Sequence, residues 1–186
     1  NVTSNEVDRE MRNKAKMVNF GIIYGISPFG LSQRLGIKRK EASEIINNYF
    51  KEFPKIKEHM DNSIEFAKEN GYVETILKRK RYLSNINSGN ATVRGFDERN
   101  AINAPIQGSA ADIIKIAMIN IYNKIKKEKM KSKLLLQVHD ELVFELLNEE
   151  EANLKSIVRK EMMGAISFNV PLEVEIGVGN NWLEAH

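Results

Sequence analysis

Two cations and two aromatic residues recur at intervals of four near the start of the sequence, at Arg12, Lys16, Phe20 and Tyr24. On a helix each step of four advances by about 40°, so these side chains form one stripe that turns by roughly 120° over three turns. Such a stripe suits an elongated ligand with a charged and a flat end, such as a nucleoside triphosphate, because Arg and Lys bind phosphate oxygens. Aromatic residues at this spacing also pack in ordinary helix cores, so spacing alone leaves both interpretations open.

A second candidate site is the run QVHDE, Gln137 to Glu141, which separates two short apolar segments. A two-residue hairpin usually contains Asn-Gly or a similar pair that tolerates positive φ, so His139-Asp140 is an unusual turn. Departures from local rules concentrate at functional sites. A carboxylate there is placed to hold Mg²⁺, which prefers one or two carboxylates together with substrate phosphates. An Asp in a turn is, however, more often structural.

The segment NAPIQGSAAD, residues 103–112, carries two amides and many small side chains. Asn103 and Gln107 both donate and accept hydrogen bonds, which suits the minor-groove acceptors that every base pair presents. Ser109 and Asp112 have the spacing of a capping box, which predicts a helix start rather than a catalytic pair.

The composition is that of an ordinary globular protein, with 186 residues, 42% hydrophobic residues and 28 Lys+Arg against 25 Asp+Glu. The absence of Cys excludes disulfides, thiol nucleophiles and iron–sulfur centres, and the three His residues form no H-x-x-x-H ligand pair. No apolar run approaches the ~20 residues that span a bilayer, so we expect no membrane association. The net charge of +3 is too small to identify a nucleic-acid partner, although basic residues cluster at 34–40, 78–81 and 124–133. For the last cluster a solvated helix end is the simpler interpretation.

The apolar pattern predicts a helical first part and a mixed second part, an α+β fold class. Helices are expected at residues 6–24, 38–50, 54–70, 92–102, 110–130 and 149–163. Gly25, Ser27 and Pro28 are expected to stop the first of them. Pro105 and Gly108 are expected to interrupt the chain between the fourth and fifth helices, and Gly71 to end the third in a left-handed cap. Strands are expected at residues 72–77, 82–83, 134–138, 141–146 and 172–178, with a linker at 84–90.

Three motifs in order then point to a family. They are R-x-x-x-K-x-x-x-F-x-x-x-Y-G from Arg12, ERNAINAPIQGSAAD from Glu98 and QVHDELV from Gln137. The sequence resembles the C-terminal part of a family A DNA polymerase from about Val7 to the closing GNNWL. The resemblance implies an incomplete right-hand polymerase architecture. Residues 1–83 would be the fingers, with a nucleotide-binding helix at about 7–24, and residues 84–186 the C-terminal palm with an antiparallel sheet and the His-Asp hairpin.

The resemblance also implies roles for the first motif in binding the incoming deoxynucleoside triphosphate. Arg12 and Lys16 would face the triphosphate, and Lys16 would also donate a proton to the pyrophosphate leaving group. Phe20 would pack on the sugar and base, at the position where Phe or Tyr influences acceptance of sugars lacking a 3′-hydroxyl. Tyr24 would close the base pocket and, with Gly25, help to position the templating base.

The other two motifs would contact primer–template DNA and metal. Arg99, Asn103 and Gln107 would track the minor groove, and His139 would lie near the primer terminus. Asp140 would hold catalytic Mg²⁺, with Glu141 in a supporting role. Two Mg²⁺ ions in the complete site would serve nucleotidyl transfer in DNA replication and repair, and a bacterial cytoplasmic location beside the chromosome is expected.

The same resemblance predicts that this chain alone is inactive. The family has a second metal-binding Asp in an upstream motif of the type DYSQIE, and no such string occurs here. We therefore expect the missing upstream part of the same polymerase to be a partner. Two alternatives remain open: a fragment of a single-subunit RNA polymerase, against which Phe20 and the QGSAAD segment argue, and a non-catalytic module that binds primer–template.

Overall fold

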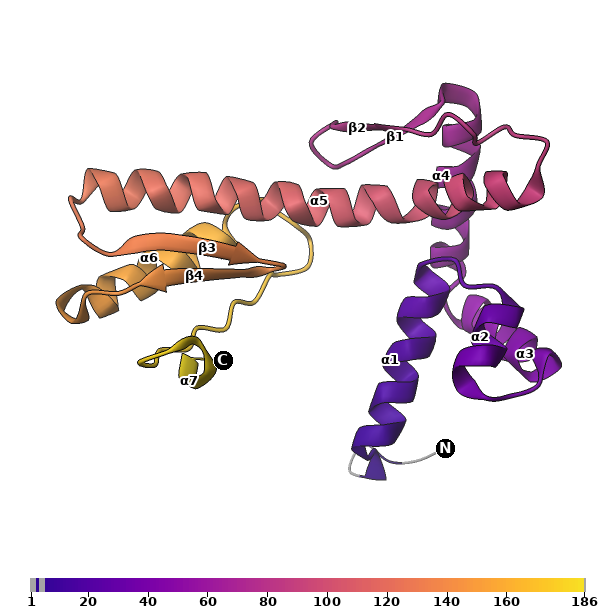
Figure 1. Cartoon of the computed structure of the whole chain (residues 1–186), viewed down its shortest axis with the longest axis horizontal. Helices are drawn as coiled ribbons and strands as arrows, with labels where there is room; N and C mark the ends of the chain where they lie inside the picture. Colours follow the sequence, from indigo (N-terminus) through magenta and orange to yellow (C-terminus); the bar gives the residue numbers. More distant parts are fainter. Residues whose placement is uncertain (1–2, 4–5, 186) are drawn as a thin grey trace. The chain divides into compact units, whose positions relative to one another are not determined.

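The computed structural model describes residue 3 and residues 6–185, which divide into two compact units, Asn1–Gln107 and Gly108–His186. The elements of the first unit are helices α1 to α4 and the hairpin β1–β2, and those of the second are the hairpin β3–β4 and helices α6 and α7 (Figure 1). Helix α5 contributes residues to both units. The mixture of helices with small antiparallel sheets confirms the predicted α+β class.

Helix α1, Arg9–Ile23, forms where the stripe of cations and aromatics predicted a helix. Asp8 caps it by accepting a hydrogen bond from Met11 N at 2.7 Å. The helix ends because Gly25 adopts φ 75°, which lets Ile26 N donate to Gly21 O at 2.8 Å. Both ends are therefore fixed by local sequence.

Helix α2, Pro28–Leu35, was not predicted. Ser27 and Pro28 were interpreted only as a stop signal for the preceding helix, but they also begin the next one. Ser27 Oγ accepts a hydrogen bond from Gly30 N at 3.1 Å, and Pro28 stands in the first turn, where its missing N–H is harmless.

Helix α3, Arg39–Glu52, follows as predicted and is tied to α1 by a hydrogen bond from Tyr49 OH to Asn19 Oδ1 at 2.7 Å. Partial burial raises the pKa of this phenol. Ile26 connects α1 to α2, because its side chain packs against Gly21 of the first helix and Gly30 of the second. A Cβ at Gly21 or Gly30 would lie 3.3 or 3.0 Å from the Ile26 side chain. These contacts hold the far end of α1 against α2 and α3.

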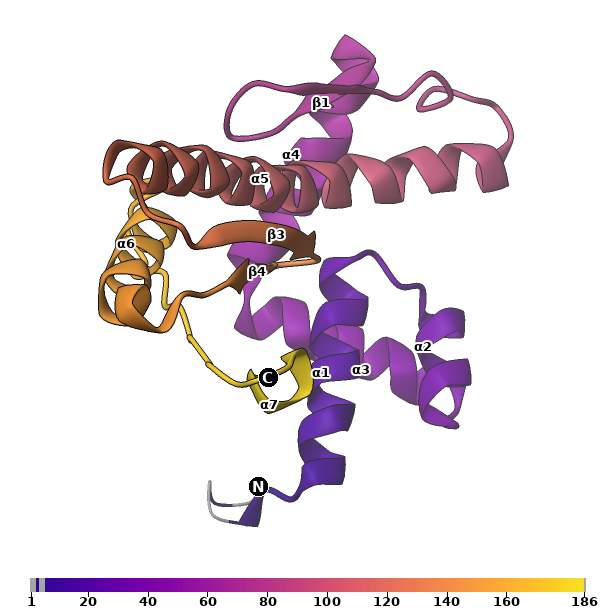
Figure 2. The same ribbon diagram turned by 60° about the vertical axis from the view of Figure 1, so that its left-hand side comes forward.

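Helix α4, Pro54–Asn70, ends at Gly71 with φ 74°, as its sequence predicted. Strands β1, Tyr72–Glu74, and β2, Lys80–Tyr82, then pair antiparallel, shorter than expected. Figure 2 shows this hairpin beside α4, and Arg81 of β2 donates a hydrogen bond to Asn100 of α5. They enclose a small core of Ala67, Val73, Leu83, Ile86 and Ala101.

The loop at 84–90, expected to be a linker, is a packed part of the first unit. Ile86 is buried in the core, and Asn85 N donates to the buried carboxylate of Asp97 at 2.8 Å. The division of the chain into fingers and palm at residue 84 stays a prediction. It differs from the division into two compact units, which falls after Gln107.

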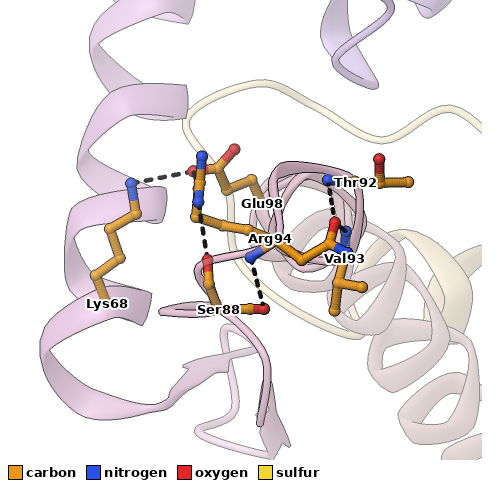
Figure 3. Close-up of polar contacts among 7 residues, drawn as sticks. Lys68, Ser88, Thr92, Val93, Arg94 and Glu98 are labelled. Atoms are coloured by element: carbon orange, nitrogen blue, oxygen red, sulfur yellow. Dashed lines mark hydrogen bonds and ion pairs between the residues drawn. The ribbon is translucent and has the colours of Figure 1, made fainter.

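Polar contacts fix the beginning of α5, Ala91–Lys127 (Figure 3). Asn90 Oδ1 accepts hydrogen bonds from the backbone nitrogens of Thr92 and Val93, as a capping residue does. Arg94 donates to Ser88 O at 2.8 Å, and Glu98 contacts both Arg94, at 3.7 Å, and Lys68 of α4, at 3.0 Å. The first two turns of α5 are therefore held against α4 and the preceding loop.

Helix α5 runs unbroken, which contradicts the predicted interruption at Pro105 and Gly108. Ser109 and Asp112 lie inside the helix, so the predicted capping box is also wrong. A proline in a helix interior costs about 3 kcal/mol. Apolar burial on both sides offsets this cost, since Ala101 and Ile102 before it and Ile114, Ala117 and Ile121 after it are buried. Neither α5 nor another helix among the described residues has the length and apolarity needed to cross a membrane.

The second unit is built on the antiparallel hairpin of β3, Lys133–Val138, and β4, Glu141–Glu145, which confirms the two predicted strands. The register shifts at Leu135, which forms a bulge. A short 3-10 turn, Asn148–Glu150, leads into α6, Glu151–Met163. The core contains Ile121 of α5, with Leu154, Ile157 and Val158 of α6, and Leu142 and Phe144 of β4 pack against it.

The segment 172–178 is not a strand, contrary to expectation. Its side chains do alternate, since Leu172, Val174 and Ile176 are half-buried between exposed neighbours. A strand also needs a backbone partner, and no described segment hydrogen-bonds with this one. Helix α7, Trp182–Ala185, closes the described chain.

Candidate functional site

The stripe on α1 faces away from the core. The buried residues of α1 are Gly21 and Ile22. Arg12 and Lys16 are exposed and ion-pair with no described residue, and Phe20 is 50% exposed. A solvent-facing stripe argues against the interpretation of these residues as an ordinary helix core.

The aromatic end of the stripe is ordered. The rings of Phe20 and Tyr24 are nearly parallel, with centroids 6.2 Å apart and an angle of 19° between their planes. Tyr24 is half-buried at the helix end, whereas Phe20 leaves half of its surface open. The two cations one and two turns earlier complete a surface that is positively charged at one end and flat at the other.

The end of α1 meets α5 at a glycine. A Cβ at Gly25 would lie 3.4 Å from Arg99 Cγ and 3.6 Å from Ile102 Cδ1. The positive φ of Gly25 favours glycine, whereas a Cβ there would make only ordinary van der Waals contacts with these two side chains. The structure thereby brings Gly25 of the first motif to Arg99 of the second.

The predicted DNA-contacting residues of α5 share one helical face, at intervals of four. Arg99 and Gln107 are exposed. Asn103 is half-buried, and its Oδ1 atom is buried without a hydrogen-bond partner among the described residues. An unmade hydrogen bond of this kind costs about 1–3 kcal/mol, which a ligand at this face could recover.

An exposed aromatic residue on the same face was missing from the sequence motifs. Phe96 is 59% exposed and precedes Arg99 by three residues. Its helical phase with Arg99, Asn103 and Gln107 is the signal by which the sequence could have identified it.

The basic hairpin of the first unit is partly neutralised by its own neighbours. Glu74 lies 3.2 Å from Lys78 Nζ and 4.0 Å from Lys80 Nζ. Lys80 also sits 3.9 Å from the ring centroid of Tyr72, and a hydrogen bond with that phenol raises the pKa of Lys80. Arg81 instead reaches α5, where it donates to Asn100 Oδ1 at 3.2 Å.

In the second unit the turn of the β3–β4 hairpin carries the remaining candidates. His139 adopts φ 54°, which costs roughly 1–2 kcal/mol for a residue other than glycine. Gln137 Nε2 donates to His139 O at 3.0 Å and supports this conformation. Backbone strain of this kind at a conspicuous turn is a reason to propose function there.

The turn presents one exposed carboxylate. Asp140 has neither hydrogen-bond nor ion-pair partner for its side chain among the described residues, and Glu141 is half-buried at the start of β4. The described part of the chain contains no group of three His, Asp or Glu residues that could cage a metal. Asp140 therefore fits one ligand of a Mg²⁺ ion whose other ligands come from substrate phosphates, water or further protein groups.

The open end of the same hairpin is fixed by a buried hydroxyl. Glu150 accepts hydrogen bonds from Ser132 Oγ at 2.6 Å, Ser132 N at 2.8 Å and Lys131 N at 2.8 Å. The Ser132 hydroxyl, followed by the two backbone donors, holds the pKa of Glu150 below its ordinary value. Ser132 Oγ in turn accepts from Leu147 N at 3.0 Å, so both strand ends are joined.

Comparison with known proteins identifies close relatives over the whole chain. The family model described as DNA polymerase family A matches residues 1–184. The sequence is 54% identical to DNA polymerase I of Caldicellulosiruptor bescii over 96% of this chain, and 50% identical to DNA polymerase I of Bacillus subtilis over 99%. The chain spans about a fifth of the length of these relatives, 21% in both cases.

A solved structure shows the same fold. It is titled as the POL domain of Pol1 from M. smegmatis in complex with DNA primer-template and dNTP. The TM-score is 0.96 with 44% sequence identity, over 99% of this chain and 32% of that chain.

Proposed function

The chain belongs to DNA polymerase family A, and from that premise we propose that it serves template-directed DNA synthesis. In this reaction a deoxynucleoside triphosphate is added to a primer 3′-hydroxyl with release of pyrophosphate. The observation that carries the proposal is the exposed stripe of α1, whose cations have no ionic partner among the described residues. A neighbour with the same fold was solved with DNA primer-template and dNTP, which supports these two substrate classes.

The stripe would bind the incoming nucleotide. Arg12 and Lys16 hold triphosphate oxygens, Arg12 as a bidentate fork and Lys16 as a point charge. Lys16 also donates a proton to the leaving pyrophosphate, as a positioned general acid. Phe20 offers its open ring to the sugar and base, and Tyr24 closes the pocket behind it.

The face of α5 would bind the primer–template. The minor groove is contacted by Arg99, Asn103 and Gln107. There a hydrogen-bond donor on the DNA, or a reorientation of the Asn103 amide, gives its side chain the missing partner. Gly25 lies against Arg99, so the templating base and the first base pairs would be held at one junction of α1 and α5.

The His-Asp turn would position the reacting end of the primer. His139 contacts the primer terminus, and Asp140 supplies a metal ligand with Glu141 beside it. Asp140 would hold Mg²⁺ as one ligand of a two-metal site, which would supply charge stabilisation for in-line phosphoryl transfer. The strained turn holds Asp140 out from the sheet, where it is free of protein partners among the described residues.

Asp140 alone does not complete such a site. Since the described residues hold no three-ligand group and the chain spans a fifth of its relatives' length, we propose that another segment of the polymerase contributes the second metal-binding carboxylate. The isolated chain is then inactive. A DNA substrate also implies a location beside the bacterial chromosome, in the cytoplasm.

Primer extension tests the proposal. The 186-residue chain and a full-length polymerase that contains it are assayed with Mg²⁺ and either deoxy- or ribonucleotides. Extension by the full-length protein only, with deoxynucleotides, is expected. Preference for ribonucleotides would instead support the RNA polymerase alternative, and extension by the isolated chain would contradict the incomplete metal site.

The variant Asp140→Ala in the full-length protein separates an enzyme from a binding module. Extension is expected to fall by at least ~10²-fold, while primer–template affinity persists. Glu145→Ala is the matched control, because it removes another exposed carboxylate from the same hairpin. Equal extension by both variants would exclude Asp140 from the chemistry.

A further inference from the structure

The exposed face of α5 continues beyond the residues assigned to the minor groove. Taking Arg99 as 0° and 100° per residue, Asn103, Phe96 and Gln107 lie at roughly 40°, 60° and 80°. Phe96 thus falls inside the angular range of the three polar residues, one turn nearer the start of the helix. Its 59% exposure shows that no described residue covers the ring.

The direction of this extension matters. Gly25 touches Arg99 and Ile102, so the junction with α1, where the proposed function places the templating base, lies at the Arg99 turn. Asn103 and Gln107 follow the duplex away from this junction by about 6 and 12 Å along the helix. Phe96 lies about 4.5 Å to the other side, where the template is still unpaired.

The surroundings of Phe96 favour a polyanion rather than an apolar protein surface. The guanidinium of Arg99 folds back along the helix, with Nη1 3.7 Å from the position that a Cβ on Gly95 would take. Arg81 of β2 reaches the same turn from the hairpin and bonds to Asn100 at 3.2 Å. An exposed ring on a stretch of helix that two guanidinium groups reach has the composition of a surface that stacks a base and holds its phosphates.

We propose that Phe96 is a stacking platform for the single-stranded template ahead of the templating base, with Arg99 and Arg81 supplying charge for its backbone. The proposal rests on the proposed DNA-binding face of α5. Phe96 is a positioning residue, because it orients the template without touching the reacting atoms.

Binding to two primer–template duplexes tests this role. One has an unpaired template extension of about six nucleotides and the other is blunt, and fluorescence anisotropy gives both affinities for the 186-residue chain. The wild-type chain is expected to bind the extended duplex more tightly. Phe96→Ala should weaken binding of the extended duplex by roughly 5- to 10-fold and leave the blunt duplex unchanged.

Three further variants make the result specific. Phe96→Trp should keep the preference for the extended duplex, since a larger ring still stacks. Tyr122→Ala should also keep it, because it removes an equally exposed ring, 58%, from another part of α5. Asn103→Ala should weaken both duplexes alike.

Each outcome decides between the two proposals. A Phe96→Ala variant that leaves both affinities unchanged, or lowers both equally, overturns the stacking platform and leaves DNA binding by α5 intact. A wild-type chain that binds neither duplex overturns both proposals.

Discussion

The two units place their candidate residues by different physical means. In the first unit Arg12, Lys16 and Phe20 lie on a regular helix, and the 3.6-residue period puts them on one exposed face, with Tyr24 at the C-cap. In the second unit His139 and Asp140 occupy a two-residue turn, where register and one positive φ decide their position. A helix face thus tolerates small shifts of its residues, whereas a tight turn depends on every neighbouring contact.

The two units also differ in how closely the hydrophobic core packs against the candidate residues. The first unit buries its best-defined core between α4, the β1–β2 hairpin and α5, and no α1 residue belongs to it. The second unit packs its core against the hairpin that carries the candidate site, through Leu142 and Phe144 of β4. A destabilising substitution in the core of the second unit should therefore affect its candidate site more than one in the core of the first unit.

Removal of a core side chain in the second unit gives the largest expected effect. Ile121 is fully buried, and Ile121→Ala should destabilise this unit by about 2–5 kcal/mol through lost burial and a residual cavity. Urea unfolding measures the change, and hydrogen exchange should show faster opening of β3 and β4. Ile119→Ala, at a 59% exposed position of the same helix, is the control and should cost less than about 0.5 kcal/mol. Unchanged exchange in the hairpin would contradict the coupling of core and site.

A smaller effect is expected at the end of α1. Gly25→Ala forces a Cβ into a left-handed conformation, which should cost about 1–2 kcal/mol. Gly71→Ala has the same backbone penalty but open space around the new Cβ. Only Gly25→Ala should also weaken primer–template binding, because its backbone penalty acts at the junction where the new Cβ would contact Arg99. Equal DNA affinity of the two variants would show that the junction of α1 and α5 is not part of the binding surface.

At the His-Asp turn we expect a substitution to increase the free energy of unfolding rather than lower it. His139→Gly removes the strain of φ 54° and should stabilise the second unit by up to about 1 kcal/mol, while extension by the full-length polymerase falls. Lys129→Gly also relieves a φ of 54° but should leave extension unchanged. Thermal unfolding and primer extension test both variants, and a destabilised His139→Gly protein would contradict the assignment of strain.

The smallest effect concerns pH. The folded pKa of Glu150 is depressed below its ordinary value of 4.5, so its contribution to stability is complete above that value. The contribution is lost as the pH falls from about 4.5 through the folded pKa. Glu150→Gln should therefore flatten the acid limb of stability against pH, as measured by urea unfolding between about pH 5 and pH 3. An unchanged slope would show that Ser132 and Lys131 do not favour the charged carboxylate.

Much of the fold could be predicted where local rules and tertiary packing agree. Asp8 and Gly25 bound α1, Gly71 ends α4, and the two short apolar segments around His139-Asp140 predict the hairpin. Ser27-Pro28 was misinterpreted because the same residues can end one helix and begin another. The continuity of α5 through Pro105 could not be predicted, since it depends on burial at distant positions along the helix.

The candidate site was predictable in its residue types but not in its contacts. The spacing of Arg12 to Tyr24 predicted one stripe, whose exposure the structure then showed. His139-Asp140 was conspicuous as a poor turn sequence. The contact of Gly25 with Arg99 joins residues 74 positions apart in the sequence, and no local pattern encodes it. The unsatisfied oxygen of Asn103 likewise follows from packing, which the sequence does not display.

The bulge in β3 bears on how this chain behaves in concentrated solution. Leu135 and Leu136 are 54% and 53% exposed, and within the described residues β3 pairs only with β4. A short, leucine-rich strand with an unpaired edge is a template for intermolecular strand pairing. The charged residue of this strand that opposes such pairing is Lys133, at its start. Self-association of the isolated chain should therefore begin at this strand, and a charge introduced at Leu135 is the substitution that would keep the chain monomeric.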